Sequence, residues 1–328
     1  MLFRSTLEPD LPICDPHHHL WDYPNSRYLL DEILEDIDSG HNITSTIFVE
    51  CMSEYRNDSP NSLAPVGETE FVQEIAAYNN KVKNNIRIAA GIVSFADLLL
   101  GNSVKEVLEA HIEASPKRFK GIRHACGWDK SDLIRNSHTK PPASLYLNKN
   151  FRKGFAQLTA YGLTFDAWLY HTQHEELISL ARAFPEQTII LDHVGGPLGI
   201  GPYKGKRGEI LHLWKNTISK LAECENITVK LGGLSMAING FEWHKKKRPP
   251  NSKELAEAMS PYLLHCIEKF TPQRSMFESN FPVDKVSCSY NVLWNSFKRI
   301  TKGFSFDEKR FLYHDVAAKT YGISESSI

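Results

Sequence analysis

The stretch Asp15-Pro16-His17-His18-His19-Leu20-Trp21-Asp22 decides the fold of this 328-residue chain. Residues 11–14 are mostly apolar and lead directly into it, which predicts a buried strand that ends at the histidines. Because alternate residues of a strand share a face, His17 and His19 should point one way and His18 the other. Two imidazoles at one strand end suit either a divalent metal ion or a proton-transfer site.

Seven further apolar runs follow, each succeeded by a helix or by a loop that carries one. Together with the first run, the predicted strands cover residues 43–52, 86–95, 119–124, 163–170, 188–193, 227–231 and 276–282. The predicted helices cover residues 68–83, 104–112, 151–161, 175–184, 209–224, 252–270, 291–300 and 307–321. Apolar strands that alternate with helices indicate a parallel sheet covered on both faces.

Eight such units predict an α/β fold of one closed (β/α)₈ TIM barrel with parallel strands. The first strand is not followed by a GxGxxG motif, which disfavours an open dinucleotide-binding sheet. No Pro/Ser/Gly-rich linker divides the chain. We therefore expect a single domain over residues 1–328, with a core from about 12 to 322.

Composition excludes several classes of protein. The chain is 41% hydrophobic and 23% charged, with a formal net charge of -1, so neither disorder nor nucleic-acid or membrane binding is expected. The six cysteines are scattered without a CxxC pair, which indicates reduced thiols rather than a disulfide framework. Residues 1–10 are too polar for a signal peptide, and no apolar run approaches the ~20 residues of a membrane helix. A cytoplasmic protein is the expectation.

Polar residues gather at the carboxyl ends of the predicted strands, where parallel barrels carry their active sites. They are His17 and His19, Glu50, Arg123 and His124, Asp166 and His171, Asp192 and His193, Lys230, and Asn280 and Asp284. Any one histidine fits an ordinary core or loop position, but the set favours a site at this rim.

These segments resemble the amidohydrolase superfamily. The resemblance rests on the first-strand motif together with Gly121-Ile122-Arg123-His124, Leu191-Asp192-His193-Val194-Gly195-Gly196-Pro197, Val229-Lys230-Leu231-Gly232-Gly233-Leu234 and Ser279-Asn280-Phe281-Pro282-Val283, in that order. The most similar branch includes 2-pyrone-4,6-dicarboxylate lactonase and sugar-acid γ-lactonases, and it covers about residues 13–321.

The resemblance implies a rim site built from the first-strand histidines, a sixth-strand histidine and an eighth-strand aspartate. The histidines correspond to His17, His19 and His193, which would be the ligands of a metal if one is bound. Asn280 stands where the family has the aspartate that serves as general base, and an amide cannot accept a proton as a carboxylate does. Glu50, His171 and Asp284 are the candidates to replace it, with Glu50 and His171 favoured.

The chemistry expected from this set is attack of an activated water on a lactone carbonyl. A divalent metal, zinc or manganese, can activate the water, and imidazoles can do so without one; no organic cofactor is expected. Arg123, His124 and Trp128 are candidate substrate-binding residues, Arg123 for a carboxylate. Lys230 is a weaker candidate for a Schiff base, because the Gly-Gly after it indicates close backbone approach.

The prediction is therefore a lactonase-like hydrolase of a carboxylate-bearing small molecule, with His17, His19, Glu50, His171, His193 and Asn280 as catalytic candidates. Two alternatives stay open: a metal-dependent decarboxylase of an aromatic acid, and a non-catalytic small-molecule binding protein. Trp21, Trp128 and Trp168 either wall the pocket or pack in the barrel. The loops at 125–142 and 237–250 should set specificity, and a homo-oligomer is possible.

Overall fold

The computed structural model describes residues 5–82 and 86–323. Eight parallel strands form one sheet in the order β1 (Pro12–His18), β4 (Asn42–Val49), β5 (Arg87–Ser94), β6 (Phe119–Arg123), β7 (Thr164–Ala167), β8 (Ile189–Leu191), β9 (Ile227–Leu231) and β10 (Ser275–Phe277). A bridge between His18 and Phe281 brings the two edges of the sheet together. The sheet is thus a nearly closed barrel, and the predicted (β/α)₈ fold is confirmed.

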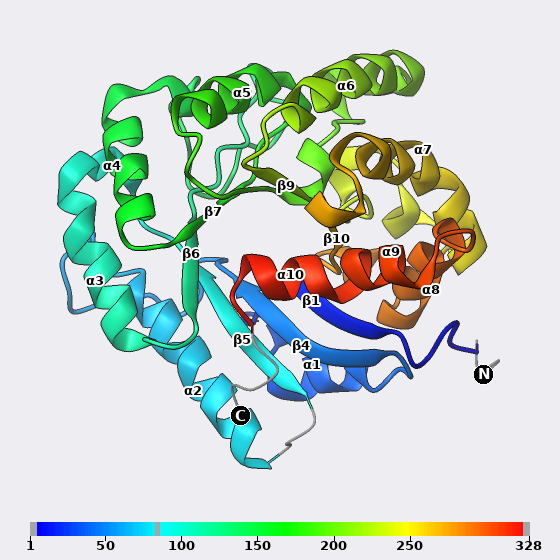
Figure 1. Cartoon of the computed structure of the whole chain (residues 1–328), viewed down its shortest axis with the longest axis horizontal. Helices are drawn as coiled ribbons and strands as arrows, with labels where there is room; N and C mark the ends of the chain where they lie inside the picture. The colour runs from blue at the N-terminus through cyan, green and yellow to red at the C-terminus, as the bar shows by residue number, and fades with distance from the viewer. Residues whose placement is uncertain (1–4, 83–85, 324–328) are drawn as a thin grey trace.

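The helices form a ring outside the strands (Figure 1). They are α1 (Leu30–Ile37), α2 (Val66–Val82), α3 (Val104–Ala114), α4 (Lys149–Ala160), α5 (His174–Ala183), α6 (Arg207–Ala222), α7 (Ser252–Phe270), α8 (Tyr290–Ile300), α9 (Phe306–Arg310) and α10 (Val316–Thr320). The sequence predicted all of these except α1, with bounds within a few residues; Lys83, the predicted last residue of α2, lies outside the described residues. A π-helical turn over Phe311–Asp315 joins α9 to α10.

Local sequence explains where these helices begin. Asn251 Oδ1 accepts hydrogen bonds from the backbone N–H groups of Lys253 and Glu254 at 2.9 and 3.1 Å. Glu254 Oε2 in turn accepts one from Asn251 N–H at 2.7 Å, so the two side chains form a capping box at the start of α7.

Besides α1, two strands between β1 and β4 were not predicted. Strands β2 (Trp21–Tyr23) and β3 (Ser26–Tyr28) pair antiparallel as a short hairpin, which lies at the mouth side of β1 and leads into α1. Each strand has only three residues, and most of these are exposed, so neither contains the apolar run by which the other strands were found.

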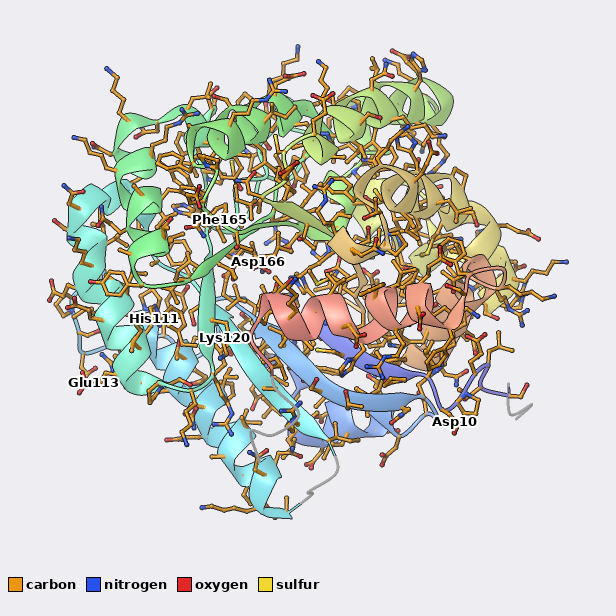
Figure 2. All side chains as sticks on the ribbon, viewed as in Figure 1. Asp10, His111, Glu113, Lys120, Phe165 and Asp166 are labelled. Carbon is orange, nitrogen blue, oxygen red and sulfur yellow. The ribbon has the colours of Figure 1, made fainter. Side chains whose placement is uncertain are left out.

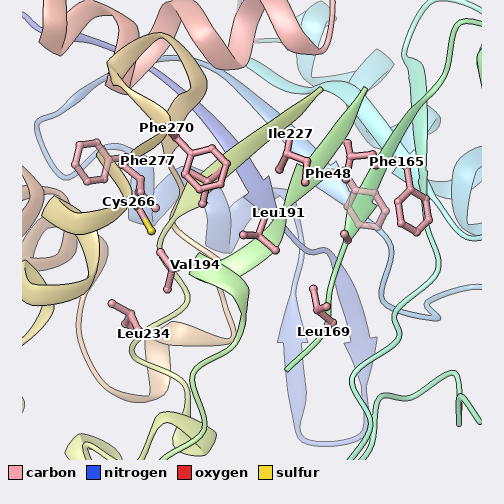
Figure 3. Packing of buried hydrophobic residues seen from close by; sticks show 14 of the residues in the cluster. Phe48, Phe165, Leu169, Leu191, Val194, Ile227, Leu234, Cys266, Phe270 and Phe277 are labelled. Carbon is pink, nitrogen blue, oxygen red and sulfur yellow. The ribbon is translucent and has the colours of Figure 1, made fainter. Parts of the chain in front are cut away.

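The main core lies between the strands and the helices. Figure 3 shows members contributed by strands, such as Phe48 and Phe165, together with Phe270 of α7. A second apolar cluster fills the lower interior of the barrel. It contains Cys14, Ile47, Val49, Val93, Ile190 and Met276 from the strands and Val316, Ala317 and Tyr321 from the C-terminal helical segment, which therefore forms the floor of the barrel.

Two further expectations concern the whole chain. All six cysteines are free thiols, as their spacing predicted. Among the residues that the structure describes, we find no helix with the length and hydropathy needed to cross a membrane.

Candidate active site

The end of β1 presents two histidines to the inside of the barrel and one to the outside. The ring centroids of His17 and His19 lie 5.0 Å apart, whereas Nε2 of His18 lies 2.9 Å from Thr46 Oγ1 on the outer face. Burial lowers the pKa of both His17 and His19, so both rings are neutral at pH 7. His19 Nδ1 lies 2.7 Å from the carbonyl of Val49, and because a carbonyl only accepts, His19 carries its lone pair on Nε2.

Glu278, directly after β10, joins the histidines of β1 and β8 into one cluster. Its Oε1 accepts hydrogen bonds from Nδ1 and from the backbone N–H of His193, at 2.7 and 3.0 Å. Its Oε2 lies 2.9 Å from His17 Nδ1, without the alignment of a hydrogen bond. Burial acts to raise the pKa of this carboxyl, but His193 and His17 outweigh burial and lower it to about 2. Glu278 is thus an ionised, buried carboxylate.

The turn that carries His193 has an unusual backbone. His193 and Val194 have φ values of 52° and 48°, in the left-handed region that costs a non-glycine residue about 1–3 kcal/mol. The glycine pair after β9 makes room for this turn. A Cβ on Gly232 would lie 2.4 Å from Glu278 Cγ, and one on Gly233 would lie 2.5 Å from the His193 ring. The Gly-Gly motif therefore serves close backbone approach.

Arg123 and Glu50 form a buried ion pair beside His17. Arg123 Nε donates to Glu50 Oε1 at 2.7 Å and Nη2 donates to the Glu50 carbonyl at 2.5 Å. Nη1 lies 3.3 Å from His17 Nε2 and 3.5 Å from Asp192 Oδ2. The other carboxylate oxygen of Glu50 lies 2.9 Å from Nε2 of His138, which belongs to the loop at 125–142. Burial acts to raise the pKa of Glu50, but His138 and Arg123 lower it to about 2.

Lys230 lies on the floor side of this cluster between two carboxylates. Its Nζ lies 2.5 Å from Asp166 Oδ2 and 3.1 Å from Asp192 Oδ1, and Tyr321 donates its hydroxyl to the same oxygen of Asp166 at 2.7 Å. Figure 2 labels Asp166 on β7, inside the ring of helices. Burial acts to lower the pKa of Lys230, but Asp166 and Asp192 raise it. The amine therefore stays protonated, which disfavours the Schiff-base role.

Asn280 and His124 point away from the buried cluster. Asn280 donates its backbone N–H to the His17 carbonyl at 2.9 Å and its side-chain amide to Asp284 Oδ1 at 3.0 Å, so it ties the rim together. His124 follows Arg123 on the strand and turns outward, where its Nδ1 accepts from Leu98 N–H at 3.3 Å.

His171 and Trp128 lie in the loops above the strands. His171 Nδ1 accepts from Leu198 N–H at 3.3 Å, and its ring contacts Tyr203 at 5.2 Å. Trp128 is held through its backbone N–H, which donates to Gln173 Oε1 at 2.9 Å. Of the nine residues predicted from the sequence, five lie together in the cluster: His17, His19, Glu50, Arg123 and His193.

Two tryptophans flank the histidines. Trp21 stacks on His19 with ring centroids 5.9 Å apart, and Trp168 meets His193 edge-on at 4.8 Å. Tyr23 continues the first stack at 5.6 Å from Trp21 and is 38% exposed. The rings of His19, Trp21 and Tyr23 thus form one stack that runs from the buried cluster to the surface.

Comparisons with known proteins show the family of the chain. A family model described as Amidohydrolase matches residues 14–323. The chain belongs to the amidohydrolase family. The resemblance predicted from the motifs is confirmed, and the protein is a hydrolase.

Relatives of this amidohydrolase cover nearly the whole chain. An uncharacterized protein of Sinorhizobium fredii is 32% identical over 96% of this chain and 99% of its own length. The L-fucono-1,5-lactonase of Burkholderia multivorans is 23% identical over 95% of this chain and 96% of its own length. A crystal structure of an amidohydrolase from Burkholderia multivorans with bound zinc shares the fold, with a TM-score of 0.73 and 21% identity over 95% of this chain and 99% of that one.

The donors of this amidohydrolase fit one divalent cation. His17, Asp192 and His193 each offer a ligand atom, and these atoms lie within 4.8 Å of one another. Asp192 Oδ1 makes no hydrogen bond of good geometry, although Lys230 stands near it. Imidazole nitrogen and carboxylate oxygen are donors that zinc and manganese accept. Asp192, rather than the predicted His19, completes this set of three.

Sequence reasoning missed Glu278 and His138. Glu278 was read as part of the last strand, and His138 lies in a loop without a motif. No local signal marked Glu278, because β10 ends at Phe277 and strand alternation does not continue to residue 280, where φ is 55°.

Proposed function

We propose that this amidohydrolase opens a lactone or a related cyclic ester of a small molecule that bears a carboxylate, with water attacking at the carboxyl-terminal rim of the barrel. One observation carries the proposal: His193 is held by an ionised carboxylate through Nδ1, which leaves the lone pair on Nε2 to accept a proton. The L-fucono-1,5-lactonase of Burkholderia multivorans, similar over 95% of the chain, supports a lactone as the substrate.

Ester hydrolysis needs a base for water, a charge that stabilises the oxyanion, and an acid for the leaving alkoxide. His193 Nε2 takes the proton of the attacking water, and Glu278 stabilises the imidazolium that forms. His19 presents a second lone pair on Nε2, which orients the water or a substrate hydroxyl. When the ring opens, the imidazolium of His193 returns its proton to the alkoxide.

Arg123 supplies positive charge next to His17. Four of its five N–H groups face Glu50, His17 and Asp192, which leaves one N–H of Nη2 for a substrate oxygen. Trp21 and Trp168 offer aromatic surface beside His19 and His193 for the ring of a substrate.

A metal ion held by His17, Asp192 and His193 would polarise the carbonyl and acidify water. In that case Glu278 and Arg123 keep the same contacts and orient the histidine ligands.

The test is to incubate the protein with a panel of sugar-acid and dicarboxylate lactones and to measure hydrolysis by the release of protons. His193→Ala should lower kcat/KM by about 10²–10⁴-fold, because it removes the base. His111→Ala is the matched control: this histidine is equally buried but contacts Thr69 Oγ1 outside the barrel, so activity should stay within about threefold.

Release of CO₂ from a 2-hydroxybenzoate-type acid with no lactone turnover would replace the proposal with a decarboxylase. Binding of lactones without turnover of either kind would replace it with a binding protein.

A further inference from the structure

His138 connects the loop at 125–142 to the buried ion pair of Glu50 and Arg123. Its Nε2 lies 2.9 Å from Glu50 Oε2, and the other carboxylate oxygen of Glu50 accepts from Arg123 Nε at 2.7 Å. The Glu50 side chain is fully buried, whereas the His138 side chain is 26% exposed. A carboxylate that is paired with a guanidinium has no proton to donate, so Nε2 of His138 carries the proton of this hydrogen bond.

The two carboxylate oxygens of Glu50 therefore depend on different donors. Arg123 donates to Oε1 and to the backbone carbonyl of Glu50, and His138 donates to Oε2. A buried carboxylate oxygen without a donor lacks the interaction that offsets its removal from water. Without His138, the Glu50 carboxylate should turn towards another donor, and its bond to Arg123 Nε would then weaken.

The loop itself is anchored by contacts that do not involve this ion pair. Tyr170, after β7, donates its hydroxyl to the Arg135 carbonyl at 2.5 Å. Tyr203, in the loop after β8, donates its hydroxyl to Asp129 Oδ2 at 2.6 Å. Because these two bonds hold the loop from two other strand ends, the loop should keep its place when the side chain of His138 is replaced.

Arg123 is the group through which this arrangement reaches the substrate. Its Nη1 faces His17 Nε2 and Asp192 Oδ2, at 3.3 and 3.5 Å, and its side chain keeps 5% exposure. One N–H of Nη2 is left for a substrate oxygen. Recognition of a carboxylate by a guanidinium depends on the plane of its N–H groups, so a small turn of Arg123 should weaken that contact.

We propose that His138 is a positioning residue for recognition of the anionic substrate: it fixes Glu50, and Glu50 fixes the guanidinium plane of Arg123 towards the substrate carboxylate. The loop at 125–142 thereby contributes to specificity through an ion pair beneath it. This inference rests on the proposed function for its effect on substrates, but the hydrogen bond of Arg123 Nε–H can be followed without any substrate.

The first experiment measures hydrogen exchange of Arg123 Nε–H by ¹H–¹⁵N NMR of the full chain, with the signal assigned by Arg123→Lys. We expect slow exchange in the wild-type protein, because this N–H is buried and bonded to Glu50. His138→Leu should speed the exchange by about tenfold or more, and His138→Gln, whose amide can still donate to Glu50, should restore most of the protection. Equal protection in His138→Leu and the wild-type protein would overturn the proposal.

The second experiment compares two lactones with the same ring, one with a carboxylate and one without. For the lactone that bears the carboxylate, His138→Leu should raise KM by about tenfold and leave kcat within about threefold, because binding and not the chemical step is affected. KM for the neutral lactone should not change. A fall in kcat with both lactones at unchanged KM would contradict the proposal, because His138 would then serve the chemical step.

Asn136→Ala is the matched control. Asn136 lies in the same loop, and its Oδ1 accepts the backbone N–H of Asp129 at 3.0 Å. This variant disturbs the loop without removing a contact of Glu50, so the exchange rate and KM should both stay within about threefold of the wild-type values. Equal effects of Asn136→Ala and His138→Leu would overturn the proposal, because the loop as a whole would then be responsible.

The two proposals fail in different ways. If the wild-type chain opens no lactone, but exchange of Arg123 Nε–H responds to His138→Leu and not to Asn136→Ala, the proposed function fails and the positioning of Arg123 by His138 stands. If lactones are opened and neither the exchange rate nor KM responds to His138→Leu, the proposed function stands and the positioning role fails.

Discussion

The barrel carries two sets of buried histidines, and the two sets differ in their partners. His17 and His193, inside the barrel, face the carboxylate of Glu278. His18, His111 and His174, outside it, face hydroxyl groups: Thr46 at 2.9 Å, Thr69 at 2.8 Å and Thr217 at 2.7 Å. Both sets are almost fully buried.

The difference teaches that burial alone does not mark a reactive histidine. A hydroxyl, together with the backbone carbonyl that His111 and His174 also face, satisfies a neutral imidazole but supplies no charge. A carboxylate stabilises the protonated ring, which is what a group that accepts a proton needs. The outer histidines therefore hold strands and helices together, and the inner ones are available for chemistry.

Acid should destabilise the folded protein, and this is the largest effect we expect. Burial lowers the pKa of nine histidines below the unfolded value of 6.5, to about 3 for His18 and about 4 for His111. The nine are His17, His18, His19, His41, His111, His124, His171, His174 and His265. A lowered folded pKa gives stability that is present above pH 6.5 and lost as pH falls towards the folded value.

Four buried carboxyls act in the opposite direction, because their pKa is raised: Asp15 and Asp166 to about 6, Asp284 to about 7 and Glu68 to about 8. The histidines outnumber them, and each net proton is equivalent to about 1.4 kcal/mol per pH unit. Urea unfolding at pH 7, 6 and 5 should show a falling free energy. A constant or rising value would mean that the histidines are not held neutral.

The neighbours His17 and His18 provide the sharpest test of the comparison, because they lie on opposite faces of one strand. His17→Gln should lower kcat/KM by about 100-fold or more. His18→Gln should leave it within about threefold and lower the free energy of unfolding by about 1–3 kcal/mol, through the disturbed bond to Thr46. The opposite pattern of activity would reverse the assignment of inner and outer roles.

A smaller effect is expected at the hydroxyl partner of an outer histidine. Thr217→Val removes the hydroxyl 2.7 Å from His174 Nδ1 and should lower the free energy of unfolding by about 1 kcal/mol without changing kcat. Thr172→Val, at an exposed position, is the matched control and should change it by less than about 0.5 kcal/mol. Loss of activity in Thr217→Val would mean that His174 also belongs to the site.

The strands were predictable because each is a continuous apolar run between helices. Once the strands were located, the polar residues at their carboxyl ends could be predicted to lie at one rim of the barrel. Alternation along β1 correctly separated His17 and His19 from His18. The same rule, applied to β6, would have placed His124 on the face opposite Arg123, where the structure has it.

The eighth strand shows why the rest was not predictable. It was expected over residues 276–282 but ends at Phe277, because residues 280 and 281 cross to β1, where Asn280 N–H donates to the His17 carbonyl. The site predicted from the sequence therefore included Asn280 and not Glu278. Ion pairs between side chains far apart in the sequence, such as that of Lys230 with Asp166, leave no local pattern in the sequence.

The floor of the barrel has a consequence for how the chain matures during synthesis. The apolar lower interior is covered by Val316, Ala317 and Tyr321, which are synthesised after all the strands. Until then the half-built barrel exposes both an open sheet edge at β1 and an uncovered apolar interior, the two features that invite aggregation of nascent chains. Efficient production of this protein therefore depends on rapid docking of residues 311–321, and a shortened chain without them should accumulate as an insoluble product.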